Sequence, residues 1–188
     1  MDTLSTESGA CLPTIARAAI ASALGQSMQF VDAPFPWPRE PAASFVTLTL
    51  GGQLRGCIGT LQPHRSLLED VRANAVAAAL HDPRFAPLAA HELDALRIEV
   101  SVLAPPESVR ASSEADLVAL LRPGIDGVIV QYGAHRSTFL PQVWTQLPHP
   151  SDFLAHLKQK AGLPANFWHE AMHWQRYTVQ KWSEPLRP

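Results

Sequence analysis

The sequence has few cysteines, a small share of charged residues, no excess of positive charge and no long hydrophobic run. Two cysteines among 188 residues, Cys11 and Cys57, are too few for a disulfide framework and predict a reducing, cytoplasmic compartment. The formal net charge of −2 gives no positive field that would attract nucleic acid. No apolar run approaches the roughly 18–20 residues that span a bilayer, and the first ten residues do not resemble a signal peptide. We therefore expect neither a nucleic-acid nor a membrane partner.

Proline, in contrast, is abundant, with 17 of 188 residues, about 9% against a usual value of roughly 5%. Because proline fixes φ and lacks an N–H group, this excess predicts many loops and element boundaries. Two proline-rich stretches, residues 33–41 and 104–106, are candidate linkers between subdomains.

Hydrophobic periodicity predicts a mixture of helices and strands. Phe45–Leu50 alternates at period two, and Gln53–Gly59 follows a glycine turn as the second strand of a hairpin. The other expected strands are 96–103, 128–132, 137–140 and 177–182. Hairpins predominate over βαβ units, so the predicted fold class is α+β with largely antiparallel sheets.

Capping signals mark the predicted helices. Ser66 and Glu69 form a capping box at the start of one helix, which ends near Asp82. Gly25 and Gly162 are placed to end two others. The expected helices besides the capped one cover residues 13–24, 113–121 and 151–161.

The most unusual segment is LRGCIGT at residues 54–60, where two glycines flank a cysteine inside a predicted strand. Glycine in a strand usually marks a bulge or the close approach of another group. At period two, Arg55, Cys57 and Gly59 share one face, and a guanidinium there would favour the reactive thiolate of Cys57. The alternative is that Cys57 is a small buried hydrophobic residue.

A second candidate cluster, His81, Asp82 and Arg84, follows the capped helix. These side chains could supply a base, the carboxylate that orients it and a guanidinium that binds an anion. The alternative is a simple helix terminus in which Asp82 and Arg84 pair with each other.

Two further regions could contribute to a site. Gln142 could offer directional hydrogen bonds and Trp144 an apolar wall, although both could equally serve packing. Glu99 lies in a strand that otherwise has the pattern of a core strand, so its carboxylate needs a partner or an exposed sheet face.

Residues 169–173 match the H-E-x-x-H pattern, in which two histidines on a helix bind zinc and the glutamate activates water. A third ligand is missing, since no histidine follows His173. We therefore predict no metal site. Phosphate-binding and dinucleotide-binding glycine motifs are also absent from the sequence, so we predict no cofactor.

Taken together, these segments resemble the AMMECR domain family, whose hallmark is the LRGCIGT segment at 54–60. Collinear matches continue at residues 70–71, 74–75, 82–85, 98–103, 124–128, 139–144 and 160–163. The resemblance covers residues 12–184 as a single AMMECR-type domain, between a polar leader, 1–11, expected to be disordered, and a tail, 185–188.

The resemblance implies a fold of two α/β subdomains with largely antiparallel sheets flanked by helices, a cleft between them, and the hallmark segment near that cleft. It also implies a link to the AmmeMemoRadiSam system, whose other components are a Memo-like protein and a radical S-adenosylmethionine protein. These two proteins are the expected partners.

Two functions follow as alternatives. In the first, the protein is a component of an enzymatic or modification system in which Cys57 is the reactive group. Arg55 would then stabilise the thiolate or bind an anionic substrate, His81 or Glu99 would act as base, and Gln142 would orient the substrate.

In the second, the protein is a non-catalytic binding module for a partner protein or a small anionic ligand. Arg55, Arg84 and Trp144 would then be the recognition groups, and Cys57 would be dispensable.

Overall fold

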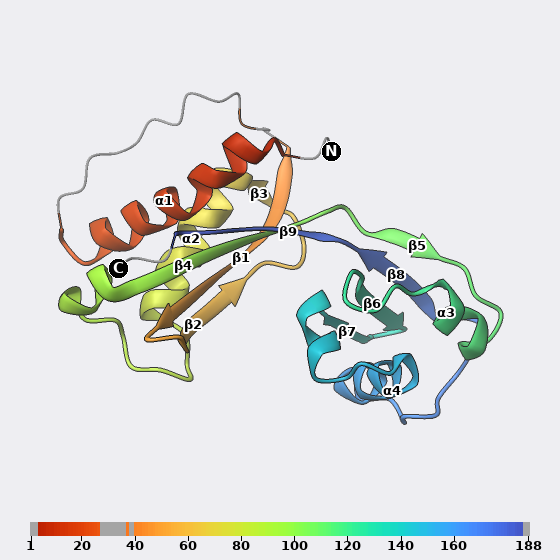
Figure 1. Ribbon diagram of the computed structural model, residues 1–188. Coiled ribbons are helices and arrows are strands. Elements are labelled where there is room, and N and C mark those ends of the chain that lie inside the picture. Colours follow the sequence, from red (N-terminus) through yellow and green to blue (C-terminus); the bar gives the residue numbers. More distant parts are fainter. Residues whose placement is uncertain (1–3, 27–36, 38–39, 186–188) are drawn as a thin grey trace. The chain divides into compact units, whose positions relative to one another are not determined.

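The structure, a computed structural model, describes residues 4–26, 37 and 40–185 (Figure 1). The chain divides into two units, unit 1 with residues 1–103 and 180–188 and unit 2 with residues 104–179. The first boundary coincides with the predicted linker at 104–106. The other candidate linker, 33–41, lies mostly outside the described residues, and its last residue begins a strand within unit 1.

Unit 1 is an antiparallel sheet packed against helices (Figure 1). Its elements are α1 Thr6–Ala23, β1 Pro41–Leu50, β2 Gln53–Gly59, β3 Arg65–Ser66, α2 Leu67–Leu80, the 3-10 helix η1 Ala90–Ala95, β4 Leu96–Leu103 and β9 Val179–Ser183. The strand order is β2–β1–β4–β9, and β3 pairs with β1. The predicted hairpin and the strand at 96–103 are confirmed.

The alternation along β1 determines which face of this sheet is covered. Val46 and Leu48 are fully buried, as are Val100 and Ile98, their partners on β4. These side chains share one hydrophobic core with residues of α1 and α2. Thr47 points the other way and is half-buried. The face opposite α1 and α2 is called the far face below.

Helix α1 begins earlier than the sequence predicted. Ser5 Oγ accepts a hydrogen bond from the N–H of Ser8 at 3.1 Å, and the helix starts at Thr6. The prediction began the helix at Pro13, which lies inside it. Residues 5–11, expected as part of a disordered leader, therefore form the N-cap and first turns of α1.

The other helix ends follow the predicted capping residues. Gly25 has a φ of 73° and ends α1. At the start of α2, Glu69 accepts the N–H of Ser66 at 3.0 Å and its hydroxyl at 2.6 Å. These bonds hold the pKa of Glu69 below its usual range.

Unit 2 is a smaller antiparallel sheet with strand order β5–β8–β6–β7. Its elements are β5 Glu107–Val109, α3 Glu114–Leu120, β6 Gly127–Tyr132, β7 His135–Phe139, the 3-10 helix η2 Pro141–Thr145, α4 Pro150–Lys160 and β8 His173–Tyr177. Phe153 and Leu157 of α4 and Trp174 of β8 belong to a second hydrophobic core. Gly162, with a φ of 79°, ends α4 as predicted.

The strand expected at 177–182 is two strands. Tyr177 ends β8 in the sheet of unit 2, whereas β9 joins β4 in the sheet of unit 1. Between them, the carbonyl of Thr178 accepts the N–H of Ala104 at 2.9 Å. The single predicted strand therefore spans a change of sheet.

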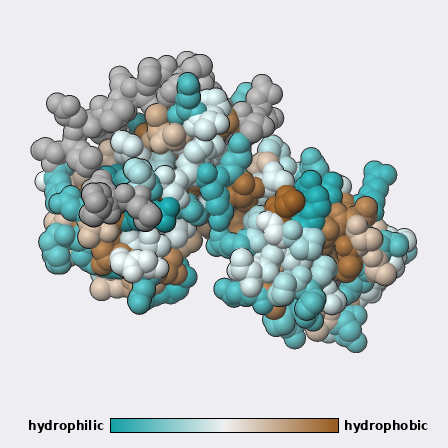
Figure 2. All heavy atoms as spheres, in the orientation of Figure 1, coloured by the Kyte–Doolittle hydropathy of each residue, from teal (hydrophilic) through white to brown (hydrophobic). Residues whose placement is uncertain are grey.

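On the visible face of each unit, hydrophilic and neutral residues alternate with small hydrophobic patches (Figure 2). The exposed large hydrophobic residues among those described are Leu54, Leu61, Leu120 and Ile125. None of the described helices has the length and apolar character needed to cross a membrane.

Candidate functional site

The two glycines of the hallmark segment are required by close packing. A Cβ atom on Gly56 would lie 2.1 Å from the carbonyl oxygen of Ala78 at the end of α2. A Cβ atom on Gly59 would lie 2.2 Å from the ring of Phe45. These positions confirm the predicted close approach, and they are explained by the fold alone.

Arg55 does not share a face with Cys57 as the alternation predicted. Leu54 pairs with Thr49 and Gly56 pairs with Leu48, so Arg55 is an extra residue in β2 without a partner on β1. Such a bulge interrupts the period of two and redirects the side chain.

The redirected guanidinium of Arg55 is committed to the loop that follows α2. Its Nε donates to Glu92 Oε1 at 2.9 Å and its Nη1 to the carbonyl of Ala86 at 2.9 Å. The hydrogen bond with Glu92 raises the pKa of Arg55, and it lowers the pKa of Glu92. Arg55 thus fastens the loop to β2 instead of serving the thiol.

Cys57 is fixed at the free edge of the sheet. Its N–H donates to Asp82 Oδ2 at 2.8 Å, and its carbonyl accepts from Arg84 Nη2 at 3.1 Å. β2 is an edge strand, and the Asp82–Arg84 pair occupies the backbone groups that another strand would otherwise bind. The second candidate cluster of the sequence is therefore joined to the hallmark segment.

The Asp82–Arg84 ion pair contacts the backbone of Cys57. Asp82 is buried and accepts Nε and Nη2 of Arg84 at 2.9 and 2.7 Å. These bonds hold the pKa of Asp82 well below its usual range and raise the pKa of Arg84. The Arg84 side chain is 53% exposed. Arg84, and not Arg55, supplies the guanidinium beside the thiol.

The thiol lies on the far face in a row of polar side chains. Cys57 Sγ is half-buried and 3.3 Å from Thr47 Oγ1. Thr47 pairs in turn with Glu99 on β4. Glu99 accepts a hydrogen bond from Ser183 Oγ at 3.0 Å and lies 3.5 Å from Lys181 Nζ. The Glu99 carboxylate therefore lies on the open face of the sheet and has polar partners, as its position in the strand required.

Neither predicted base contacts the thiol. His81 is the C-cap of α2 with an exposed side chain, and no hydrogen bond joins it to Cys57 in the described structure. Glu99 is separated from Cys57 by the intervening strand. The site therefore brings together a thiol, a hydroxyl and a guanidinium.

The remaining predicted residues belong to unit 2. Trp144 is 4% exposed, stacks on Phe153 with ring centroids 3.8 Å apart, and donates its Nε1–H to the carbonyl of Asp126 at 2.7 Å. It is a core residue, so its predicted role as an exposed recognition group is wrong. Gln142 is exposed in η2, where its backbone carbonyl accepts a hydrogen bond from Thr145 Oγ1 at 2.7 Å.

A buried polar network in unit 1 was not predicted. Asp70 is fully buried and accepts the hydroxyls of Ser44 and Thr60 at 2.6 and 2.8 Å, as well as Arg65 Nε at 2.8 Å. Asn74, one turn along α2, also donates to Asp70. The family pattern includes Asp70 and Asn74, and these matches were the sequence signal that could have indicated the network. The network is internally satisfied and joins α2 to the sheet.

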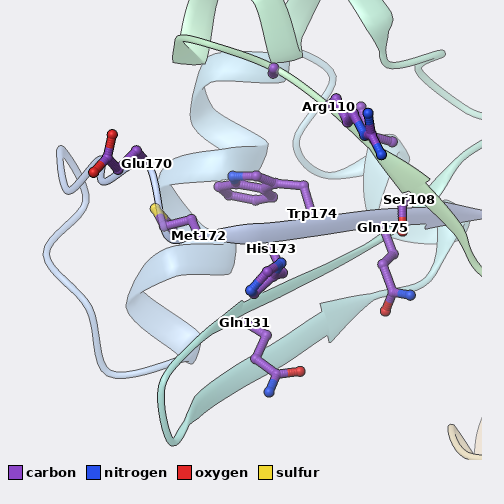
Figure 3. Close-up of a pocket in the computed structure, with 10 residues that line it drawn as sticks. Ser108, Arg110, Gln131, Glu170, Met172, His173, Trp174 and Gln175 are labelled. Atoms are coloured by element: carbon purple, nitrogen blue, oxygen red, sulfur yellow. The ribbon is translucent and has the colours of Figure 1, made fainter.

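The sequence also gave no indication of a cavity in unit 2, of about 650 Å³ (Figure 3). It lies at the end of the β5–β8 pairing, and the paired residues Val109 and Trp174 line it. Arg110, Glu170 and His173 also line it. Figure 3 shows these side chains around the indole of Trp174.

His173 belongs to the H-E-x-x-H match, which does not form a helix. Residues 169–172 form turns and irregular backbone, and His173 begins β8. His169 Nδ1 accepts the N–H of Ala171 at 3.0 Å. The two histidines thus lack the i, i+4 helical arrangement of a zinc site. Among the described residues, no group of three or more His, Cys, Asp or Glu side chains could hold a metal ion.

Comparison with known proteins identifies the family of this chain. Residues 13–182 match the family model described as AMMECR1. The chain belongs to the AMMECR1 family. One AMMECR1-family relative, a protein of Methanothermobacter thermautotrophicus, is 41% identical over 171 residues, covering 89% of this chain and 88% of its own. Another, protein MJ0810 of Methanocaldococcus jannaschii, is 35% identical over 171 residues, covering 89% and 85% of the two chains.

A crystal structure with the same fold is also known. The crystal structure of an uncharacterized protein, PH0010 from Pyrococcus horikoshii, superposes with a TM-score of 0.83 at 34% identity. The match covers 96% of this chain and 93% of that one. The α+β prediction and the family resemblance are confirmed.

Proposed function

We propose that this AMMECR1-family protein is a cytoplasmic component of an enzymatic or modification system in which Cys57 is the reactive group. One observation carries the proposal. Within the hallmark segment, Cys57 alone presents a reactive side-chain atom that does not fasten other elements together, and its thiol is half-buried on the far face.

The surroundings of the thiol support this role. Reactive cysteines lie in partly exposed positions near positive charge, which favours the thiolate. The Arg84 guanidinium donates to the Cys57 carbonyl at 3.1 Å and is held in place by Asp82. Thr47 Oγ1 can donate a hydrogen bond to a thiolate. A proton acceptor would come from the substrate, from solvent or from a partner protein.

The proposed partners are the Memo-like protein and the radical S-adenosylmethionine protein that the family resemblance implies. They are chosen on that resemblance alone. Purification of each with this chain, wild type or Cys57→Ser, tests the association. The proposed complex is expected to form with both versions, because the substitution alters one atom on the far face.

Alkylation by iodoacetamide tests the reactive thiol, and Cys11 provides an internal reference. The Cys11→Ser variant reports on Cys57 and the Cys57→Ser variant on Cys11, which is also half-buried. We expect Cys57 to react faster at neutral pH than both Cys11 and a cysteine in an unfolded peptide. A rate at or below that of Cys11 would contradict the proposal.

A second candidate function is a binding module for an anionic group. It rests on the Arg84 guanidinium. Its Nε and Nη2 are fixed by Asp82 and the Cys57 carbonyl, and half of its side chain is exposed. A guanidinium held in this way can receive a carboxylate or phosphate at Nη1. Binding would then be lost in Arg84→Gln and retained in Cys57→Ala, whereas the reactive-thiol proposal expects Cys57→Ala to be inactive.

A further inference from the structure

The cavity of unit 2 has the size and mixed lining of a ligand site. Its volume of about 650 Å³ falls within the range of small-molecule pockets. Val109, Met172 and Trp174 supply apolar surface, and Arg110 and Glu170 supply opposite charges. All of these residues lie in unit 2.

Trp174 brings an unsatisfied donor to this cavity. The residue is 4% exposed, and its buried Nε1 has no hydrogen-bond acceptor among the residues that the structure describes. A buried indole N–H normally has a partner, as that of Trp144 has in the carbonyl of Asp126 at 2.7 Å. A ligand would reach this nitrogen only after the residues that cover it shift, and a carbonyl oxygen would then supply the missing acceptor.

The two charged side chains of the cavity are also uncommitted. Arg110 and Glu170 are exposed, and neither side chain forms an ion pair or hydrogen bond with another described residue. They stand at opposite ends of the view, with Trp174 and Met172 between them (Figure 3). Arg122 of the same unit, in contrast, pairs with Asp126 at 2.6 Å.

We propose that this cavity binds a short zwitterionic peptide of two or three residues with an apolar side chain. Its carboxylate would pair with Arg110 and its ammonium group with Glu170, and a backbone carbonyl would accept the Trp174 Nε1–H. The apolar side chain would lie against Met172. A single amino acid fits less well, because its two charges are adjacent whereas those of the cavity are separated by the apolar wall.

The test uses the full chain and the tripeptide alanyl-leucyl-alanine, with the indole N–H resonances of ¹⁵N-labelled protein as the readout. The Trp174 resonance, identified by its loss in Trp174→Phe, is expected to move as the tripeptide is added. Trp168→Phe identifies the neighbouring indole and supports the assignment if Trp174→Phe does not fold. A Trp174 resonance that stays fixed up to the solubility limit of the peptide would overturn the inference.

Removing a charge from the cavity or from the peptide tests the orientation of the bound peptide, with calorimetry as the measurement. Arg110→Gln and Glu170→Gln are each expected to weaken binding about three- to fivefold, as for partly exposed ion pairs. Acetylating the peptide's amino group should weaken binding to the wild type by the same factor and leave binding to Glu170→Gln unchanged. Equal affinity of the free and acetylated peptides for the wild type would contradict the proposal.

Two matched variants complete the experiment. Arg136→Gln removes an exposed arginine of β7 that does not line the cavity, and it is expected to bind like the wild type. Cys57→Ser is also expected to bind normally, so the inference stands or falls separately from the reactive thiol. A loss in Arg136→Gln equal to that in Arg110→Gln would show nonspecific electrostatic attraction and overturn the site.

Discussion

The hallmark segment of unit 1 and the cavity of unit 2 use their polar groups in opposite ways. Around Cys57, the charged side chains are paired: Arg55 with Glu92 at 2.9 Å and Arg84 with Asp82 at 2.7 Å. In the cavity, neither Arg110 nor Glu170 has an ion-pair or hydrogen-bond partner among the described residues, and the Trp174 Nε1 lacks an acceptor there.

The difference separates residues that build the fold from residues that remain free for a ligand. A buried or paired polar group is costly to remove because its partner is left unsatisfied. An exposed, unpaired group contributes little to stability. The hallmark segment therefore combines mostly structural residues with one candidate reactive atom, whereas the cavity offers groups that can be exchanged without loss of the fold.

The largest expected effect is on the packing of the hallmark glycine. Gly56→Ala places a Cβ atom 2.1 Å from the Ala78 carbonyl oxygen, so β2 and α2 must separate. We expect the free energy of unfolding to fall by about 2–3 kcal/mol in urea denaturation, as for other overpacked sites.

Gly133→Ala is the matched control. This glycine has a φ of 56° in a hairpin turn, with open space around its Cβ position. The substitution adds only backbone strain and should cost about 1–2 kcal/mol. Equal or smaller destabilisation in Gly56→Ala would contradict the close approach of α2 to β2.

The next effect is the pH dependence that Asp82 contributes. Its hydrogen bonds with Arg84 hold its pKa lower in the folded than in the unfolded chain. The ionised form therefore stabilises the fold above the usual aspartate pKa of about 3.9, and this contribution is lost as the pH falls below it. We expect the stability difference between wild type and Asp82→Asn to shrink as urea denaturation is repeated from about pH 6 to about pH 2. A difference that stays constant over this range would show that the carboxylate charge is not involved.

The smallest effect is expected in the cavity. Arg110→Gln and Glu170→Gln should each change the free energy of unfolding by less than about 0.5 kcal/mol, because neither side chain has a partner in the described part of the chain. Arg55→Gln, which breaks the pair with Glu92, should cost about 1–2 kcal/mol in the same assay. A destabilisation in the cavity variants comparable to that of Arg55→Gln would remove the contrast between the two regions.

Local signals were sufficient to predict most elements of the fold. The alternation at 45–50, the capping box at Ser66 and the helix stops at Gly25 and Gly162 each depend on a few neighbouring residues. The α+β class followed from the order of these elements. The start of α1 was missed, although Ser5 provides the N-cap that could have indicated it.

The candidate site was harder to predict from the sequence because its geometry depends on contacts between distant segments. One extra residue in β2 moves Arg55 away from Cys57, and Arg84, 27 positions along the chain, takes its place. Trp144 was assigned to a pocket because the sequence could not show its stacking on Phe153. The cavity combines parts of β5, β6 and β8, and no local pattern joins them.

The rate of Cys57 alkylation with and without Arg84 tests the central claim most directly. All proteins carry Cys11→Ser, and the rate of iodoacetamide alkylation is measured at neutral pH. The protein with Arg84 intact is compared with Arg84→Gln, and Arg55→Gln is the matched control variant. Loss of the neighbouring guanidinium should slow the reaction about three- to fivefold, the effect of one nearby charge at a partly exposed site, whereas Arg55→Gln should leave it nearly unchanged. An unchanged rate in Arg84→Gln, or an equal loss in Arg55→Gln, would contradict the assignment of Arg84 as the group that activates Cys57.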